Sequence, residues 1–171
     1  MHTPQTTNSL NKEKLYSVLI RQLEALTEDE PFYLSNLANA AALLFNALPN
    51  INWAGFYLLR RGELVLGPFQ GNVACMRIQV GKGVCGTAVA KNEAQLVPDV
   101  HKFPGHIVCD SSSNSEIVIP ICYKGEVIGV LDIDSPVFNR FNDEDKVGLE
   151  SFARVLESAC DWEETGEAWI S

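Results

Sequence analysis

Three cysteines are the side chains of this sequence best suited to redox chemistry, namely Cys75, Cys85 and Cys109. A cysteine thiolate is a nucleophile that can be oxidised to a sulfenic acid, and a second cysteine then converts that acid to a disulfide. The sequence contains no Cys-x-x-Cys pair, so it indicates neither a thioredoxin-type motif nor a zinc ribbon.

The local settings of these cysteines differ. Cys109 lies in a long segment, residues 99–115, in which Pro, Gly, Asn and Ser interrupt any period, and long loops in compact domains are usually functional. Cys85 lies near the start of a predicted short helix, where free backbone N–H groups favour a thiolate. Asp110 beside Cys109 has the opposite effect, because a negative charge raises a thiol pKa. Local chemistry therefore favours Cys85 as the low-pKa thiol.

The other two of the five cysteines are predicted to serve packing. Cys122 borders a predicted hairpin turn, and Cys160 lies among apolar residues of the last predicted helix. An odd number of cysteines cannot all pair within one chain, and five are too few for a disulfide scaffold.

Three carboxylates are predicted to gather on one face of that hairpin. Two apolar strands flank the turn at Lys124-Gly125, and a three-residue loop that ends at Gly125 puts this glycine in the left-handed position such loops favour. In that register Glu116 faces Asp132, and Asp134 lies on the same face. The opposite face is then entirely apolar and forms a core surface.

Like charges opposite one another destabilise a sheet, so this cluster suggests a site that binds a cation or handles a proton. A small ligand with an ammonium group fits such a cluster, and one carboxyl group that stays protonated can act as an acid. The alternative is that the strand ends fray and the acids keep the sheet edge soluble. The sequence leaves both interpretations open.

Trp53 and Tyr57 lie four residues apart in a predicted strand and therefore on one face of it. Aromatic residues in strands usually belong to the core, and the alternative is that these two form the wall of a ligand site.

Two further patterns give no site. The segment 81–86 matches Gly-x-Gly-x-x-Gly but lacks the βαβ setting of a dinucleotide site, and its glycines are explained by a tight turn from strand to helix. The side chains of His101, His106 and Cys109 include metal-ligand types, but their spacing matches no common zinc pattern. No metal site is therefore predicted.

The apolar periodicity predicts the elements that must position these residues. Helices are predicted at residues 10–26, 31–48 and 84–90, and after the capping residue Asn142. Strands are predicted at residues 51–59, 64–66, 74–80, 116–122 and 127–134. This order predicts a single α+β domain with an antiparallel sheet and helices packed on one side.

Composition excludes several classes of protein. The chain has 171 residues, 46% of them apolar and 20% charged, as in one globular domain. Its net charge of -9 argues against nucleic acid or an anionic membrane as partner. No apolar run approaches the ~20 residues of a membrane span, and the first residues lack a secretory signal, so a cytoplasmic location with reduced thiols is expected.

The motifs together resemble a known family. The segments 81–86 and 125–134 and the capped last helix look like a GAF domain. More narrowly, Asn52-Trp53-Ala54-Gly55-Phe56-Tyr57, with the three cysteines and three carboxylates, is similar to the free methionine-R-sulfoxide reductases. The resemblance implies a GAF-like catalytic domain at residues 10–162, between a flexible N-terminus, 1–9, and a C-terminal tail, 163–171.

The resemblance also implies a reaction, the reduction of the R epimer of free methionine sulfoxide. Cys109 would attack the sulfoxide, and Cys75 or Cys85 would resolve the sulfenic acid. The residues implied to surround and polarise the substrate are Trp53, Tyr57, Glu116, Asp132 and Asp134. Thioredoxin is the implied reductant, with no metal or organic cofactor.

A second hypothesis, from a different class, is a GAF module that binds a small molecule without catalysis, because this fold hosts sensors of many ligands. The sequence does not determine the oligomeric state, and a homodimer is one of the states that it allows.

Overall fold

The structure is a computed structural model that describes the backbone of residues 4–163, with side chains from residue 11 onward. Its elements, in chain order, are α1 (Pro4–Thr27), α2 (Tyr33–Ala47), β1 (Trp53–Arg60), β2 (Glu63–Gly71), β3 (Arg77–Gln79), α3 (Gly83–Lys91), β4 (Gln95–Val97), η1 (Val100–Lys102), β5 (Ser115–Tyr123), β6 (Glu126–Ser135) and α4 (Asp143–Ala159).

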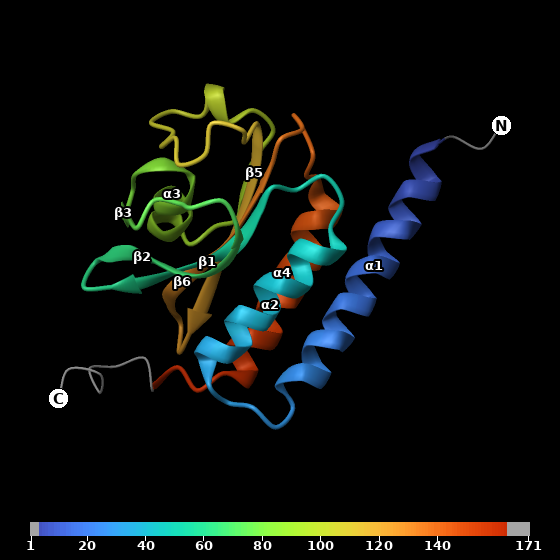
Figure 1. Ribbon diagram of the computed structural model, residues 1–171, viewed down its shortest axis with the longest axis vertical. Helices are drawn as coiled ribbons and strands as arrows, with labels where there is room; N and C mark the ends of the chain where they lie inside the picture. The colour runs from blue at the N-terminus through green and yellow to red at the C-terminus, as the bar shows by residue number, and fades with distance from the viewer. Residues whose placement is uncertain (1–3, 164–171) are drawn as a thin grey trace.

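The six strands form one antiparallel sheet in the order β3-β2-β1-β6-β5-β4, which confirms the predicted α+β class. Helices α2 and α4 pack on one face of the sheet, and α1 packs outside them (Figure 1). The prediction that the helices lie on one side is wrong for α3, which covers the opposite face.

This arrangement gives the sheet two separate apolar cores. The larger one joins α1, α2 and α4 to the sheet face that contains Ile117, Leu131 and Ile133. The smaller one joins α3 to the face that contains Trp53 and Tyr57. The second core lies against the long loop that follows β4, so it is the one that can form a ligand site.

The start of the first helix and two short elements differ from the prediction. Helix α1 begins at Pro4, within the segment 1–9 that was predicted to be flexible, and residues 1–3 and 164–171 lie outside the described residues. Strand β4 and the short helix η1 were not predicted, because three residues are too few to show a period. Residues 103–114 form no helix or strand, as expected for the long loop.

The hairpin of β5 and β6 has a different register from the predicted one. Lys124 and Gly125 have φ values of 50° and 80°, so they form a two-residue turn and not a three-residue loop. A bulge at Ile121/Cys122 then shifts the pairing by one further residue. Glu116 therefore faces Asp134 and not Asp132.

The shared face of the acids survives this correction. The observed register differs from the predicted one by two residues, and side chains two apart in a strand point to the same side. Ile117, Ile119 and Ile133, which were predicted on the apolar face, are buried beneath the helices.

Candidate active site

A small cavity of about 40 Å³ lies between α3, the uncovered part of the sheet face and the loop 103–114. Seven of the eight predicted site residues line it, namely Trp53, Tyr57, Cys85, Cys109, Glu116, Asp132 and Asp134. The eighth, Cys75, is bonded to Cys109. The structure therefore brings together all eight predicted site residues, from six separate segments of the chain.

Cys75 and Cys109 form a disulfide although they lie 34 residues apart in the sequence. Their Cα atoms are 5.3 Å apart, and both residues are half-buried. Cys75 comes just before β3, and Cys109 lies in the long loop, so the bond ties that loop to the end of the sheet. The sequence left open whether Cys75 or Cys85 pairs with Cys109, and in this structure Cys75 does.

The short helix α3 holds Cys85 against the sheet. Gly81 and Gly83 both have positive φ values, and a Cβ on Gly86 would collide with the backbone oxygen of Gln79. The three glycines thus allow the tight turn that was expected at this segment. The turn directs the Cys85 thiol into the interior, toward the acids of β5 and β6.

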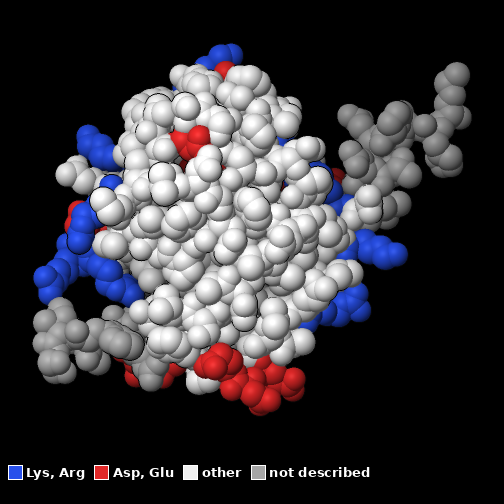
Figure 2. Space-filling view, viewed as in Figure 1, with Lys and Arg blue, Asp and Glu red and all other residues white. Residues whose placement is uncertain are grey.

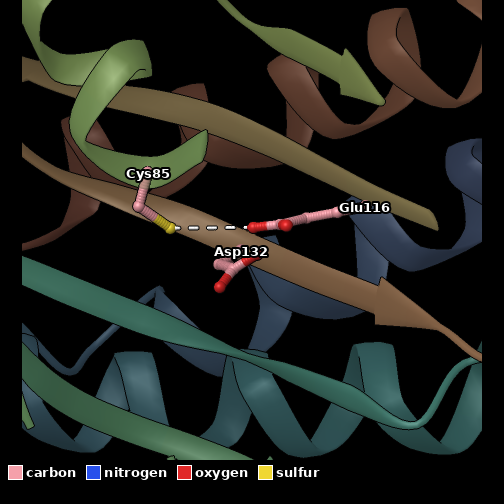
Figure 3. Close-up of side chains that lie close together, drawn as sticks. All are labelled: Cys85, Glu116 and Asp132. Atoms are coloured by element: carbon pink, nitrogen blue, oxygen red, sulfur yellow. Dashed lines mark hydrogen bonds between the residues drawn. The ribbon is translucent and has the colours of Figure 1, made fainter. Parts of the chain in front are cut away.

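Cys85, Glu116 and Asp132 point toward one another in this interior (Figure 3). The Cys85 Sγ donates to Glu116 Oε1 over 3.9 Å. Burial, and then the nearby carboxylates, raise the pKa of the Cys85 thiol well above its usual value. The prediction of a low-pKa thiol at Cys85 is therefore wrong, because burial and like charges outweigh the favourable helix start.

The three carboxyl groups have raised pKa values for the same reason. Burial is the largest cause in each, and it raises the pKa of Asp132 to about 6 and those of Glu116 and Asp134 well above their usual values. Glu116 and Asp132 are each only 6% exposed, so the interpretation of a frayed, soluble edge is wrong for them. Asp132 Oδ1 is buried without a hydrogen-bond partner, which leaves it free for a ligand.

Trp53 and Tyr57 belong both to the second core and to the cavity wall. Their rings are stacked with centroids 5.9 Å apart, and Trp53 also stacks on Phe69. Tyr57 Oη donates to the backbone oxygen of Cys75 over 2.9 Å, and Trp53 Nε1 donates to that of Asn72 over 3.1 Å. The two aromatic residues therefore fix the segment that contains Cys75 while their rings face the cavity.

A polar network that the sequence reasoning missed holds the loop in place. Asn52 Nδ2 lies within hydrogen-bond distance of Asp110, Ser112 and Ser113, and Asn72 Nδ2 donates to Asp110. Hydrogen bonds from Ser112 lower the pKa of the Asp110 carboxyl, which therefore stays ionised. The signal in the sequence was the polar run after Cys109, but a run of this kind does not reveal its distant partner.

Among the described residues, Cys85, Glu116 and Asp132 are the group whose donor atoms lie within 4.8 Å of one another and whose types suit a metal ion. Sulfur and carboxylate ligands fit zinc, although the protons that these groups hold compete with a metal. Two of the metal-ligand types noted in residues 99–115 have other partners. Cys109 is in the disulfide, and His101 Nε2 pairs with Asn114 Oδ1.

The described helices, including the 24-residue α1, all lack the combination of length and apolar character needed to cross a membrane. Figure 2 shows few charged side chains at the centre of the face in view, with Lys, Arg, Asp and Glu gathered around its edge.

Comparison with known proteins agrees with the fold and with the family that the sequence resembles. The GAF domain model matches residues 16–160, which makes this a GAF-domain protein. The free methionine-R-sulfoxide reductase of Escherichia coli is 57% identical over 148 residues, covering 86% of this chain and 90% of that protein. The one from Saccharomyces cerevisiae is 45% identical over 161 residues, covering 90% of this chain and 89% of that protein.

A solved structure gives the same result. The free methionine-R-sulfoxide reductase from Neisseria meningitidis, in complex with its substrate, superimposes with a TM-score of 0.84 at 45% identity and covers 86% of this chain and 89% of that one. The chain belongs to the free methionine-R-sulfoxide reductase family of GAF-domain proteins.

Proposed function

We propose that this protein reduces free methionine-R-sulfoxide to methionine, with Cys109 as nucleophile and Cys75 as resolving cysteine. The observation that supports this most directly is the Cys75–Cys109 disulfide at the edge of a cavity lined by three buried carboxyl groups. The names and similarity of the relatives support the same substrate.

The reaction begins with attack of the Cys109 thiolate on the sulfoxide sulfur. The sulfoxide oxygen takes up a proton and is transferred to Cys109, which becomes a sulfenic acid while methionine leaves. Cys75 then attacks the sulfenic sulfur, water departs, and the disulfide of this structure forms. A dithiol must return two electrons and two protons to restore both thiols.

The carboxyl cluster supplies both the proton and the binding charge. Burial, and then repulsion by Asp132, raise the pKa values of Glu116 and Asp134, so each can act as an acid. Asp132, with a pKa of about 6, ionises most readily and has a free oxygen for the substrate ammonium. An approaching ammonium group in turn favours ionisation of the cluster.

This cluster also gives a physical reason for selecting the free amino acid. Free methionine sulfoxide has an ammonium group, whereas a residue within a protein has a neutral amide there and continues in two directions. The rings of Trp53 and Tyr57 supply the apolar wall for the substrate methyl group.

Cys85 takes a different role from the two cysteines of the disulfide. Its raised thiol pKa keeps it protonated, so we assign it the task of donating to Glu116 and fixing the orientation of that carboxyl group. Thioredoxin as reductant, the absence of a metal or organic cofactor, a cytoplasmic location and a homodimer stay predictions.

An assay with both epimers of methionine sulfoxide, free and within a peptide, tests the proposed function. With dithiothreitol present, the free R epimer should be consumed and Cys109→Ser should abolish turnover, while the matched Cys122→Ser variant keeps it. Full turnover in Cys109→Ser removes Cys109 from the nucleophile role. Binding of the sulfoxide without turnover in the wild-type protein would instead support the sensor hypothesis.

A further inference from the structure

The most exposed large apolar side chains of the described residues surround the disulfide. They are Val73, Met76 and Val108, with exposed fractions of 87%, 75% and 64%. Met76 follows Cys75 directly, Val73 precedes it by two residues, and Val108 directly precedes Cys109. We call these three residues the disulfide rim.

The disulfide bond forces the members of the rim to be neighbours although two distant segments supply them. The Cα atoms of Cys75 and Cys109 are 5.3 Å apart. Because consecutive Cα atoms are about 3.8 Å apart, those of Met76 and Val108 lie at most about 13 Å from each other. Val73 and Cys109 border the same cavity. The rim thus places three exposed apolar side chains close to a half-buried disulfide, on both of the segments that the disulfide joins.

Scattered exposed apolar residues need no explanation, but a cluster around a reactive bond does. The cavity does not account for it, because Met76 and Val108 are not among the lining residues. Neither side chain contributes to the two apolar cores. These side chains therefore face outward, where only a second molecule can bury them.

We propose that the disulfide rim is the docking surface of a protein dithiol reductant of the thioredoxin class. This inference rests on the proposed function, which regenerates the Cys75–Cys109 disulfide in every cycle. The reductant must bring a thiolate into line with the disulfide, and apolar contacts around that bond hold it there. Small thiols need no such surface.

The redox step balances with that dithiol alone. A thiolate of the reductant attacks one sulfur of the disulfide, which breaks the Cys75–Cys109 bond and forms a mixed disulfide. The second thiol of the reductant then attacks the mixed disulfide and releases this protein. Cys75 and Cys109 gain two electrons and two protons, and the reductant becomes a disulfide.

The test measures reduction of the isolated disulfide by thioredoxin, without any sulfoxide, through free-thiol formation over time. The double variant Met76→Gln/Val108→Asn keeps the net charge and removes the apolar rim. We expect its second-order rate with thioredoxin to fall about tenfold, which corresponds to about 1.4 kcal/mol of lost interface contact. Its rate with dithiothreitol should equal that of the wild type.

Val147→Asn is the matched control, because Val147 is a 62% exposed valine on α4, on the other side of the sheet. Unchanged reduction by thioredoxin in the double variant, or an equal fall in Val147→Asn, overturns the proposal. A variant that loses self-association but keeps its thioredoxin rate assigns the rim to a second copy of this chain and also overturns it. Because no sulfoxide is present, these results stand even if the enzyme assay fails.

Discussion

Glu116 is a buried acid, only 6% exposed, and the charged groups that shift its pKa are other acids. Burial is the first cause of its raised pKa, and repulsion by Asp132 and Asp134 adds to it. The thiol of Cys85 donates to one of its oxygens. A carboxyl group held neutral in this way can donate a proton to a sulfoxide oxygen, which a solvated glutamate does poorly at neutral pH.

Replacing Glu116 by Gln should therefore separate catalysis from stability. Glutamine has the shape of a protonated glutamate, so the melting temperature should change little, whereas loss of the transferable proton should lower kcat/KM by about 100-fold or more. Glu126→Gln is the control, because Glu126 is exposed at the hairpin end of the same strand pair. If Glu116→Gln lowers the melting temperature markedly as well as the activity, Glu116 has a structural role.

The raised pKa of Asp132 predicts how stability depends on pH. The value rises from 3.8 to about 6 on folding, so the folded state binds the proton more tightly than the unfolded state. Below about pH 4, protonation of Asp132 makes its full contribution to the free energy of unfolding. This contribution, about 3 kcal/mol, is lost as the pH rises through 6. The cause is burial, which disfavours the ionised form of Asp132.

Asp132→Asn should cancel this dependence. Below pH 4 the variant should melt with the wild type, and at pH 7.5 it should melt at a higher temperature while its activity is much reduced. Thermal unfolding of both proteins across this pH range measures the difference. A variant that is less stable than the wild type at pH 7.5 contradicts the prediction.

The sequence predicted seven of the residues that line the cavity, but it did not predict their electrostatics. Cys85 shows the reason. Its position at a helix start is visible in the sequence, and that feature alone lowers a thiol pKa. The acids that reverse the effect come from strands more than 30 residues away, and their distance to the thiol depends on the packing of α3 on the sheet.

At the scale of elements, the predicted hairpin of β5 and β6 had the wrong turn but placed Glu116 on the correct face of the sheet. The turn type was wrong, since Lys124 adopts a positive φ value that was expected of Asn, Asp or Gly. A two-residue turn alone would have put Glu116 on the apolar face. The bulge at Ile121/Cys122 restores it to the acidic face, and no residue type in the sequence identifies that bulge.

The start of α4 is a second place where the structure shows contacts that the sequence did not reveal. Asn142 caps this helix as predicted, and Asp145 completes a capping box with it. The carboxylate of Asp145 also accepts from Tyr16 Oη and from Lys12 Nζ, both over 2.8 Å, and these bonds join α4 to α1. The cap involves residues only three positions apart, so it can be predicted from the sequence. The partners of Asp145 in α1 lie about 130 residues away, so they cannot.

Asp145→Ala should consequently destabilise the protein by about 3 kcal/mol, because it removes a cap and leaves Lys12 and Tyr16 without their buried partner. Hydrogen bonds and Lys12 lower the pKa of Asp145 in the folded protein. Ionised Asp145 therefore stabilises the fold above the usual aspartate pKa, and this contribution is lost as the pH falls through the folded pKa. Urea unfolding at pH 7 measures the loss.

Asp143→Ala is the matched control for this element, since Asp143 is an exposed acid in the same first turn. It should cost only a few tenths of a kcal/mol through the helix dipole. Activity per folded molecule should be unchanged in both variants, because α1 and α4 pack on the sheet face opposite the cavity. Equal destabilisation by the two substitutions would mean that the bonds to α1 add nothing.

At the scale of the whole molecule, the sheet separates stability from chemistry. One face is sealed by three helices and holds the larger core, and the other is covered by α3 and by a loop that a disulfide fastens (Figure 1). The loop 103–114 is held by the hydrogen bonds of Asp110 and by the disulfide of Cys109. Breaking the disulfide removes one of these two attachments, so the cavity and the redox state are linked.

This link predicts that substrate binds the reduced protein more tightly than the disulfide form. A cavity of about 40 Å³ has room for a few water molecules but not for an amino acid. The double variant Cys75→Ser/Cys109→Ser mimics the reduced state without turnover, and its affinity for free methionine-R-sulfoxide should exceed that of the oxidised wild type by about tenfold or more, because no bond holds the loop over the site. Isothermal titration calorimetry measures both affinities.

Cys122→Ser in its oxidised form is the control for this comparison, because it replaces a half-buried cysteine and keeps the disulfide. It should bind as weakly as the oxidised wild type. If all three proteins bind the sulfoxide equally, the loop does not gate the cavity, and the disulfide serves only to store the two oxidising equivalents. If only the double variant binds tightly, reduction by the dithiol both restores the nucleophile and opens its pocket, so an oxidised molecule does not hold substrate that it cannot convert.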